Sequence, residues 1–356
     1  MDRLIEIAGR FRLGEKPVAV KPLGEGFIND TYMVYTGSEV PQYILQRKNH
    51  LIFTDIPAMM DNIVRVSAHI ATKVADPGRQ SLSVVPALDG NPFWRDGDGN
   101  WWTVCRFIRG SRSYDRADSP SLAYLGGRGL GKFHRQVADF NEPLAETIKG
   151  FHDIRFRFEQ WDASLSRDAA GRVGQLREEI SWIESRRERM LAFREKYEKG
   201  IIPSRVTHND TKISNFLFDA DSGELLCAID LDTLMRSTLL NDTGDALRSY
   251  TNTGAEDDRN PDNVSMDMDM FKSYMDGYLE EASGILTEQE RENLAFSGLY
   301  ITYEQVLRFL MDYIDGDVYY KTAYAEHNLV RTRAQYRLLQ SMEEKLTMME
   351  DYICQL

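Results

Sequence analysis

The chain has 356 residues, of which 42% are hydrophobic and 28% are charged, a composition typical of a globular protein large enough for two lobes and a sizeable core. The net charge of −13 disfavours a nucleic-acid-binding surface, because phosphate backbones require clustered Lys and Arg. No apolar run approaches the length of a membrane helix, so we expect no membrane partner.

Cysteine usage indicates the compartment. The three cysteines, Cys105, Cys227 and Cys354, are far apart and odd in number, which predicts a reducing environment, the cytoplasm, and no disulfide framework. No Cys-x-x-Cys or His-Glu-x-x-His spacing occurs, so we expect no structural zinc site. The N-terminal segment MDRLIEIAGRFRLGE is interrupted by charges, and we expect no signal peptide.

The first part of the chain, residues 18–109, is predicted to be rich in β-structure. Polar and apolar residues alternate there in short runs bounded by glycine-rich turns, and one stretch has apolar residues at helical spacing. The predicted strands are Val18–Leu23, Asp30–Tyr35, Tyr43–Arg47, one beginning at Ser83–Pro86, and Trp101–Ile108, with a helix over residues 55–76.

After Gly110 the pattern becomes helical. We predict helices over residues 121–138 and 170–199 and again from residue 265 to the end, with a strand–turn–strand region between the second and third. The expected fold is therefore α+β and bilobal, like that of protein kinases. A small β-rich nucleotide-binding lobe, residues 1–109, would precede a larger mainly helical lobe, residues 110–356, with the catalytic loop and substrate pocket.

The segment from Val206 to Asp232 contains the most informative motif. Asp210 follows His208 and Asn209, Asn215 comes five residues after Asp210, and Asp230 ends the apolar run Leu225–Ile229. An ATP-dependent phosphoryl transferase needs one carboxylate to accept the substrate hydroxyl proton, and an amide and a second carboxylate to hold Mg²⁺. Turn chemistry alone also favours Asn and Asp in loops. The combination with two flanking strands favours phosphoryl transfer.

Two further residues of this segment are candidates. Lys212 is predicted to point toward the transferring phosphate and offset its charge, the alternative being a surface lysine. Asp232 is either a second contact to the metal held by Asp230 or a solvated turn residue. His208 is interpreted as a structural residue that holds the loop.

A glycine-containing turn joins the first two predicted strands. Gly24 and Gly26, in Leu23-Gly24-Glu25-Gly26, would let backbone N–H groups approach phosphates, although a plain hairpin turn is the alternative. The turn is not a Walker A loop, because no Gly-Lys-Ser/Thr follows.

The strand Tyr43–Arg47 occupies the place where kinases carry a phosphate-pairing lysine, and we predict no lysine on it. Arg47 is the expected cation and Gln46 its competitor, because strand alternation lets only one of them face the cleft. Asp61 on the following helix is a candidate partner of Arg47.

The segment Asn241–Arg248 is predicted to begin a helix with Asp242 as a capping residue. Asp245 is a candidate to brace the catalytic loop.

The residues THNDTK followed by Asn215, together with CAIDLDT, GDALRSYTNTGAED, GFINDTY and YILQRKN, resemble the aminoglycoside phosphotransferase (choline kinase-like) superfamily. Within it, the chain is most similar to the N-acetylhexosamine 1-kinase group. The resemblance spans roughly residues 18–330.

This resemblance implies ATP with Mg²⁺ and a small-molecule hydroxyl as acceptor. By matching position, Asp210 would be the base and would lie at the substrate, and Asn215 and Asp230 would hold the metal. Arg308 and Tyr319 would contact a sugar. The backbone from Arg106 to Ile108 would bind adenine.

We therefore expect a kinase that phosphorylates a sugar hydroxyl, most specifically the anomeric hydroxyl of an N-acetylhexosamine, in carbohydrate metabolism. An aminoglycoside, choline or homoserine phosphotransferase is the first alternative, and a non-catalytic nucleotide-binding scaffold is the second. A protein kinase is disfavoured, because Asp-Leu-Asp stands in place of Asp-Phe-Gly and no Ala-Pro-Glu follows it. The expected partners are ATP and the acceptor, and the expected state is a monomer or weak homodimer.

Overall fold

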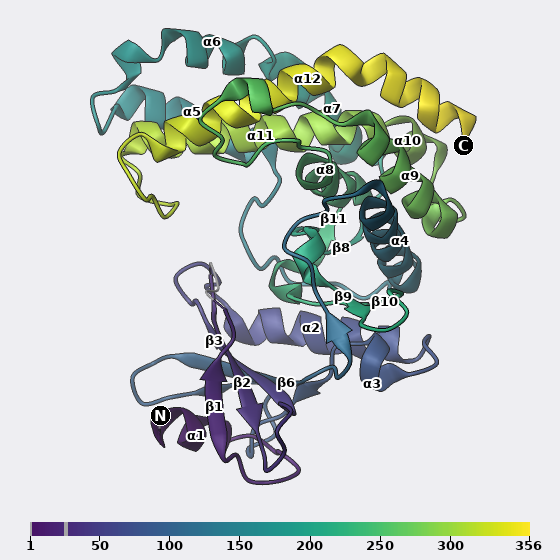
Figure 1. Ribbon diagram of the computed structural model, residues 1–356. Coiled ribbons are helices and arrows are strands. Elements are labelled where there is room, and N and C mark those ends of the chain that lie inside the picture. The colour runs from purple at the N-terminus through teal and green to yellow at the C-terminus, as the bar shows by residue number, and fades with distance from the viewer. Residues whose placement is uncertain (1, 25–27) are drawn as a thin grey trace. The chain divides into compact units, whose positions relative to one another are not determined.

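The structure, a computed structural model, describes residues 2–24 and 28–356 (Figure 1). These residues form two compact units, each assembled from segments distant in sequence. Unit 1 contains Met1–Ser113, Gln136–Lys149 and Asn215–Arg236. Unit 2 contains Tyr114–Arg135, Gly150–Ser214 and Ser237–Leu356. The boundary between lobes predicted after residue 109 stays a prediction.

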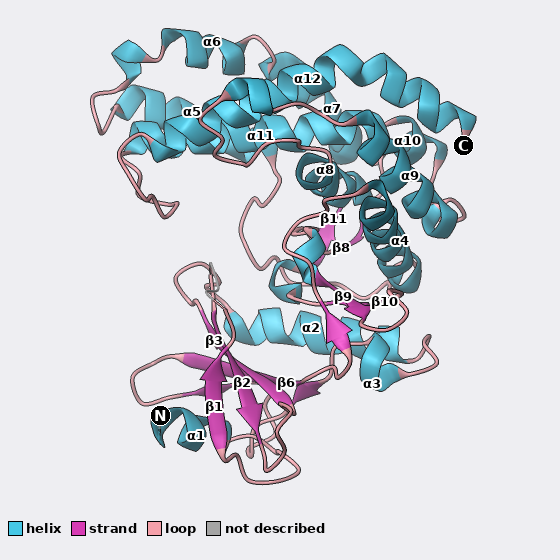
Figure 2. Cartoon of the chain, viewed as in Figure 1, coloured by secondary structure: helices cyan, strands magenta, loops and turns pink. Residues whose placement is uncertain are grey.

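Unit 1 is built on an antiparallel sheet with the strand order β1-β2-β3-β6-β4, in which β5 also pairs with β6. Figure 2 labels β1, β2, β3 and β6 of this sheet. A smaller sheet has the order β10-β9-β7. The strands of this unit are β1 (Ala19–Pro22), β2 (Asp30–Tyr35), β3 (Tyr43–Lys48), β4 (Val84–Val85), β5 (Trp94–Arg95), β6 (Trp101–Arg106), β7 (Ser111–Arg112), β9 (Phe216–Asp219) and β10 (Leu225–Ala228).

Alternate side chains of β3 point to opposite faces of the larger sheet. Tyr43 and Leu45 of β3 are buried in an apolar core that also takes residues from β1, β2, β6 and helix α1 (Asp2–Ala8). The period of two places Gln46 and Lys48 on the opposite face of the same strand. The strand thus extends one residue beyond the predicted end at Arg47, and the prediction that it carries no lysine is wrong.

The helix after β3 forms as the apolar spacing predicts, but it is shorter. Asp55 caps α2 (Ile56–Ala71) by accepting a hydrogen bond of 3.0 Å from Ala58 N–H. The helix ends at Ala71, and residues 72–76, which were predicted to continue it, form turns instead. A separate short helix follows, α3 (Pro77–Gln80), in which Pro77 occupies the first position, where no backbone N–H is needed.

Unit 2 is mainly helical, and α12 runs alongside α11 (Figure 1). It holds α4 (Pro120–Val137, the last two residues belonging to unit 1), α5 (Ile154–Arg167), α6 (Arg177–Glu184), α7 (Arg187–Glu198), β8 (Arg205–Thr207), α8 (Leu239–Tyr250), α9 (Met268–Ala282), α10 (Glu288–Glu292), α11 (Leu294–Asp315) and α12 (His327–Gln355). Short 3₁₀ turns are η1 (Val173–Gln175), η2 (Ile213–Asn215), η3 (Leu231–Thr233, in unit 1) and η4 (Pro261–Asn263), and a last strand, β11, covers Met235–Ser237.

The prediction of a single helix over residues 170–199 is wrong. The chain forms η1, α6 and α7 instead, and α5, which was not predicted, precedes them. Gly171 adopts a left-handed φ of +66°, which a right-handed helix cannot include. Within the described residues, no helix is long and apolar enough to cross a bilayer.

Candidate active site

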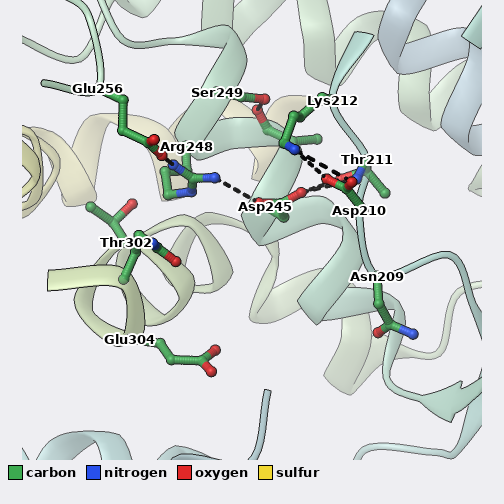
Figure 3. A network of polar contacts seen from close by, with 12 residues as sticks. Asn209, Asp210, Thr211, Lys212, Asp245, Arg248, Ser249, Glu256, Thr302 and Glu304 are labelled. Atoms are coloured by element: carbon green, nitrogen blue, oxygen red, sulfur yellow. Dashed lines mark hydrogen bonds and ion pairs between the residues drawn. The ribbon is translucent and has the colours of Figure 1, made fainter. Parts of the chain in front are cut away.

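The Asp210 loop of unit 2 lies between β8 and η2 and is held by two carboxylates of helix α8, of which Figure 3 shows Asp245. Asp242 accepts hydrogen bonds from the backbone N–H groups of His208 (2.8 Å) and Asn209 (2.6 Å). Asp245 accepts one from the N–H of Thr211 at 2.9 Å. The two acids are three residues apart and therefore share one helix face. The backbone on both sides of Asp210 is thus fixed.

This arrangement corrects the predicted role of Asp242. Helix α8 begins at Leu239, and Thr238 is its N-cap, accepting from Leu240 N–H at 3.3 Å. Asp242 is fully buried inside the helix and serves the loop. Asp245 makes the bracing contact for which it was a candidate. The sequence shows two acids near a helix start, but it does not show that their side chains point to the loop rather than to the helix terminus.

His208 lies in the interior and supports the loop geometry. Its ring packs edge-on against Phe133 with centroids 5.9 Å apart, and its Nδ1 accepts from Asp210 N–H at 3.3 Å. Asn209, the residue between, has a left-handed φ of +64°, a conformation in which Asn is enriched among non-glycine residues. The local turn therefore presents Asp210, whose side chain is one-quarter exposed.

Lys212 and Asp210 form an ion pair, with Lys212 Nζ 3.0 Å from Oδ1 (Figure 3). Desolvation lowers the pKa of Lys212, but the carboxylates of Asp210 and Asp245 outweigh this and raise it above its usual value. The lysine therefore stays protonated at neutral pH, next to the proposed base.

Asp245 also connects the loop to Arg248 on the next turn of α8. Arg248 lies 3.1 Å from Asp245 Oδ1 and 2.8 Å from Glu256 Oε1. Burial lowers the pKa of Arg248, and the two carboxylates more than reverse this. The loop is thus connected through Asp245 to the ion pairs that Arg248 forms with Asp245 and Glu256.

A second buried cluster supports the loop from helix α11. Glu304 Oε2 lies 2.7 Å from His152 Nδ1, and Glu304 Oε1 lies 3.3 Å from Arg157 Nε. His152 Nε2 in turn lies 3.4 Å from the carbonyl oxygen of Asn209. Burial raises the pKa of Glu304, but His152, Arg157 and Arg308 outweigh this and lower it to about 2.

Arg308 and Tyr319 come together in unit 2. The guanidinium of Arg308 lies 5.6 Å from the ring centroid of Tyr319 and 5.4 Å from that of Tyr320. Its Nη1 donates to Gln305 Oε1 at 3.4 Å. Burial lowers the pKa of Arg308, but Tyr320 and the carboxylate of Glu304 outweigh this and raise it. No salt bridge to this guanidinium occurs among the described residues, and Tyr319 is more than half exposed.

The two predicted metal ligands both belong to unit 1, and the β9–β10 pair brings their backbones together. Phe216 pairs with Ala228, and Ile229 N–H donates to the carbonyl of Asn215 at 2.8 Å. Asp230 follows in a left-handed conformation, with φ of 57° and ψ of 51°, and is exposed. An amide oxygen and a carboxylate at the ends of adjacent strands are the hard donors that Mg²⁺ prefers.

The phosphate-side candidates of unit 1 are rearranged relative to prediction. Arg47 pairs with Asp30 at the sheet surface, and Asp61 pairs with Arg65 and not with Arg47. Lys48 is the buried cation of this strand, and it contacts Asp232. Asp232 is therefore no solvated turn residue. Alternation from Gln46 could have identified Lys48, had the strand been continued by one residue.

The remaining predicted contacts of the nucleotide are partly described. Gly24 has a left-handed φ of +64°, which favours glycine, whereas Gly26 lies outside the described residues. Arg106 N–H donates to Ser83 O at 2.8 Å, and Ile108 O accepts from Ser111 Oγ at 2.6 Å. The side chain of Ile108 is buried in an apolar cluster with residues of β10.

Comparison with known proteins agrees with this fold. The structure resembles that of a microcompartment-associated aminopropanol kinase, with a TM-score of 0.69, 16% sequence identity and 98% of each chain covered. It also resembles spectinomycin phosphotransferase in complex with ADP and spectinomycin, with a TM-score of 0.62, 14% identity, and coverage of 96% of this chain and 98% of that one. For choline kinase from Cryptosporidium parvum the TM-score is 0.56 at 15% identity, with 98% and 96% covered.

These likenesses confirm the predicted kinase-like architecture, a β-sheet region followed by a helical part. The family is shown by sequence, because the profile of the phosphotransferase enzyme family matches residues 19–263, more than half of the chain. The chain belongs to the phosphotransferase enzyme family.

Proposed function

We propose that this protein transfers the terminal phosphoryl group of ATP to a hydroxyl of a small molecule, most specifically the anomeric hydroxyl of an N-acetylhexosamine. The observation that carries the proposal is the Asp210 loop, whose backbone is fixed by Asp242 and Asp245. A base must be held in one place to accept a proton from the attacking hydroxyl. Rigid support of a partly exposed carboxylate is what that role requires.

In this proposal Asn215 and Asp230 would hold Mg²⁺, which would offset the negative charge of the phosphates when bound. Both are oxygen donors at the ends of adjacent strands. Lys212 stays charged beside Asp210 and stabilises the charge that develops on the transferred group. The apolar cluster at Ile108 would receive the adenine ring.

The nature of the acceptor is supported by Arg308. In the proposed site its guanidinium and the exposed ring of Tyr319 contact the acceptor. The guanidinium of Arg308, which forms no salt bridge among the described residues, repels ammonium groups and donates hydrogen bonds to hydroxyl and carbonyl oxygens. This favours a neutral sugar over aminoglycosides, choline or an amino alcohol. The resemblance of the sequence to N-acetylhexosamine 1-kinases supports the same choice.

A substrate panel tests the proposal. Purified protein with ATP and Mg²⁺ is assayed for ADP release with N-acetylglucosamine, N-acetylgalactosamine, an aminoglycoside, choline, homoserine and aminopropanol. We expect release with the acetylated sugars, and ³¹P NMR should show the phosphorus on the anomeric oxygen. Turnover confined to the amines would refute the sugar assignment. ADP release with none of the acceptors, despite ATP binding, would favour a nucleotide-binding scaffold.

A further inference from the structure

We propose that Asp232 is the carboxylate that positions Lys48 for the phosphates of the nucleotide, with Asn29 as its neutral brace. This inference rests on the proposed function, because it assigns a role within the same ATP site. It concerns unit 1 alone, where all of these residues lie.

Lys48 contacts both carboxylate oxygens of Asp232. Lys48 Nζ lies 2.6 Å from Oδ1 and 2.8 Å from Oδ2 of Asp232. Its third acceptor is Gln46 Oε1, also at 2.8 Å. The carboxylate, approached through both of its oxygens, and the amide oxygen of Gln46 together orient the ammonium group. The position of Nζ is therefore fixed by the protein.

Both charged groups of this pair are buried. The side chains of Lys48 and Asp232 are 3% and 5% exposed. An unpaired charge in such a place is strongly disfavoured, so each residue requires the other. A lysine that the protein already holds in one position meets an anionic ligand without a further cost of ordering. This is the state that a phosphate-binding lysine needs.

Asn29 connects the pair to the turn that precedes β2. Its Nδ2 donates to Asp232 Oδ2 at 2.7 Å, and its Oδ1 accepts from Asn49 N–H at 3.0 Å. Asp232 is thereby held from two sides, by a cation and by an amide that is itself anchored to the backbone next to Lys48. The brace fixes the carboxylate and, through it, the lysine.

Helix α2 supplies no carboxylate for this purpose. Its one acidic residue, Asp61, has a side chain that is 62% exposed and lies 2.8 Å from Arg65 Nε. In protein kinases the corresponding lysine is paired with an acid on the helix that follows. Here the partner comes from η3, two residues after Asp230. The lysine is thus fixed to the segment that carries a proposed metal ligand.

The test measures nucleotide binding, with turnover as a second readout. Asp232→Asn keeps the side-chain volume and removes the charge. We expect the Kd for ADP, measured by calorimetry, to rise tenfold or more, with the KM for ATP rising in parallel and the KM for the acceptor within twofold. The increase should persist in EDTA, because Lys48 acts on the phosphates directly. Weaker binding only when Mg²⁺ is present would instead make Asp232 a metal ligand and overturn the inference.

The matched control is Asp61→Asn, the same substitution on the helix where protein kinases carry the partner acid. We expect its Kd for ADP to stay within twofold of wild type, and a larger effect than that of Asp232→Asn would refute the inference. Lys48→Met should weaken ADP binding at least as much as Asp232→Asn. In the Lys48→Met background, Asp232→Asn should add less than twofold, because its effect passes through the lysine. Additive effects would contradict a positioning role.

Two outcomes separate this inference from the proposed function. Failure of the wild-type protein to bind ADP or ATP contradicts the proposed function. Normal binding by the wild type and an unchanged Kd in Asp232→Asn contradicts this inference alone. If Asp232→Asn does not fold, Asn29→Ala removes only the neutral brace and leaves the ion pair. We then expect a Kd about threefold higher, and an unchanged value would count against the inference.

Discussion

Lys212 and Asp210 stand in one ion pair, with Nζ 3.0 Å from Oδ1, at the point of the loop that α8 holds from behind. The pair places a permanent positive charge beside the proposed base, and Asp245 raises the pKa of that lysine further. A carboxylate that must accept a proton and a cation that must face a phosphate are therefore neighbours. The first two predictions separate their roles.

Asp210→Asn should abolish turnover while leaving nucleotide binding intact. The amide has the same shape but accepts no proton, so kcat should fall by about 10² to 10⁴. The Kd for ADP should stay within about threefold, since Asp210 contacts the acceptor and not the nucleotide in the proposed mechanism. The assay is steady-state ADP release together with calorimetry. Near-normal turnover would exclude Asp210 as the base.

Lys212→Met should lower kcat by about 10²-fold, because it removes a charge directed at the transferred group. Lys212→Arg keeps the charge and should lose less than about tenfold, which makes it the matched control. The pKa of Lys212 is raised, so any loss of wild-type activity from deprotonation of this group should occur above the usual pKa of a lysine. Equal activity of the Met and Arg variants would show that Lys212 is an ordinary surface lysine.

Local sequence patterns predicted five of the six strands of the larger sheet and failed where a tertiary contact decides the structure. Strand β2 matches its prediction at both ends, because turns bound an alternating run. The helix expected over residues 170–199 is divided into η1, α6 and α7. Helical propensity alone does not show where packing against the rest of the unit interrupts a helix. Asp242 resembled a cap until its partners, the N–H groups of His208 and Asn209, were known. Lys48 was missed by one residue of strand length.

Arg308→Lys should weaken acceptor binding selectively. A lysine keeps the charge but loses the planar fork of donors and the stacking on Tyr319, so the KM for the acceptor should rise about ten- to a hundredfold. The KM for ATP should change by less than about twofold. Arg331→Lys, which removes a guanidinium that lies over Phe309 in the same unit, is the control. A rise in the KM for ATP alone would place Arg308 outside the acceptor site.

Gly244→Ala should destabilise the protein and reduce activity together. A Cβ at this position would lie 2.3 Å from Ser297 O and 2.6 Å from Ile301 Cγ1, so α8 would have to move away from α11. Overpacking of this kind costs about 1–3 kcal/mol in the free energy of unfolding. Because α8 carries the two acids that hold the loop, kcat should fall as well. Gly174→Ala meets nothing within 4 Å and should leave stability and kcat unchanged or slightly raised.

The pair of Glu304 and His152 should make stability depend on pH. The pKa of Glu304 is lowered to about 2, so its contribution is complete above its unfolded pKa of about 4.5 and is lost as the pH falls toward 2. Burial lowers the pKa of His152, but Glu304 outweighs this and raises it. The contribution of His152 is therefore complete below about pH 6.5 and is lost as the pH rises through the raised value. Both contributions are complete only between about pH 4.5 and 6.5.

Glu304→Gln tests this directly, because it removes the charge and leaves two buried cations uncompensated. The free energy of unfolding in urea should fall by about 3 kcal/mol at pH 5.5. At an alkaline pH above the raised pKa of His152 the loss should be smaller, since His152 has released its proton there in the wild type. Glu198→Gln breaks the surface pair with Arg155 and should change stability by less than about 1 kcal/mol at either pH. A loss from Glu304→Gln of equal size at both pH values would show that His152 does not titrate against Glu304.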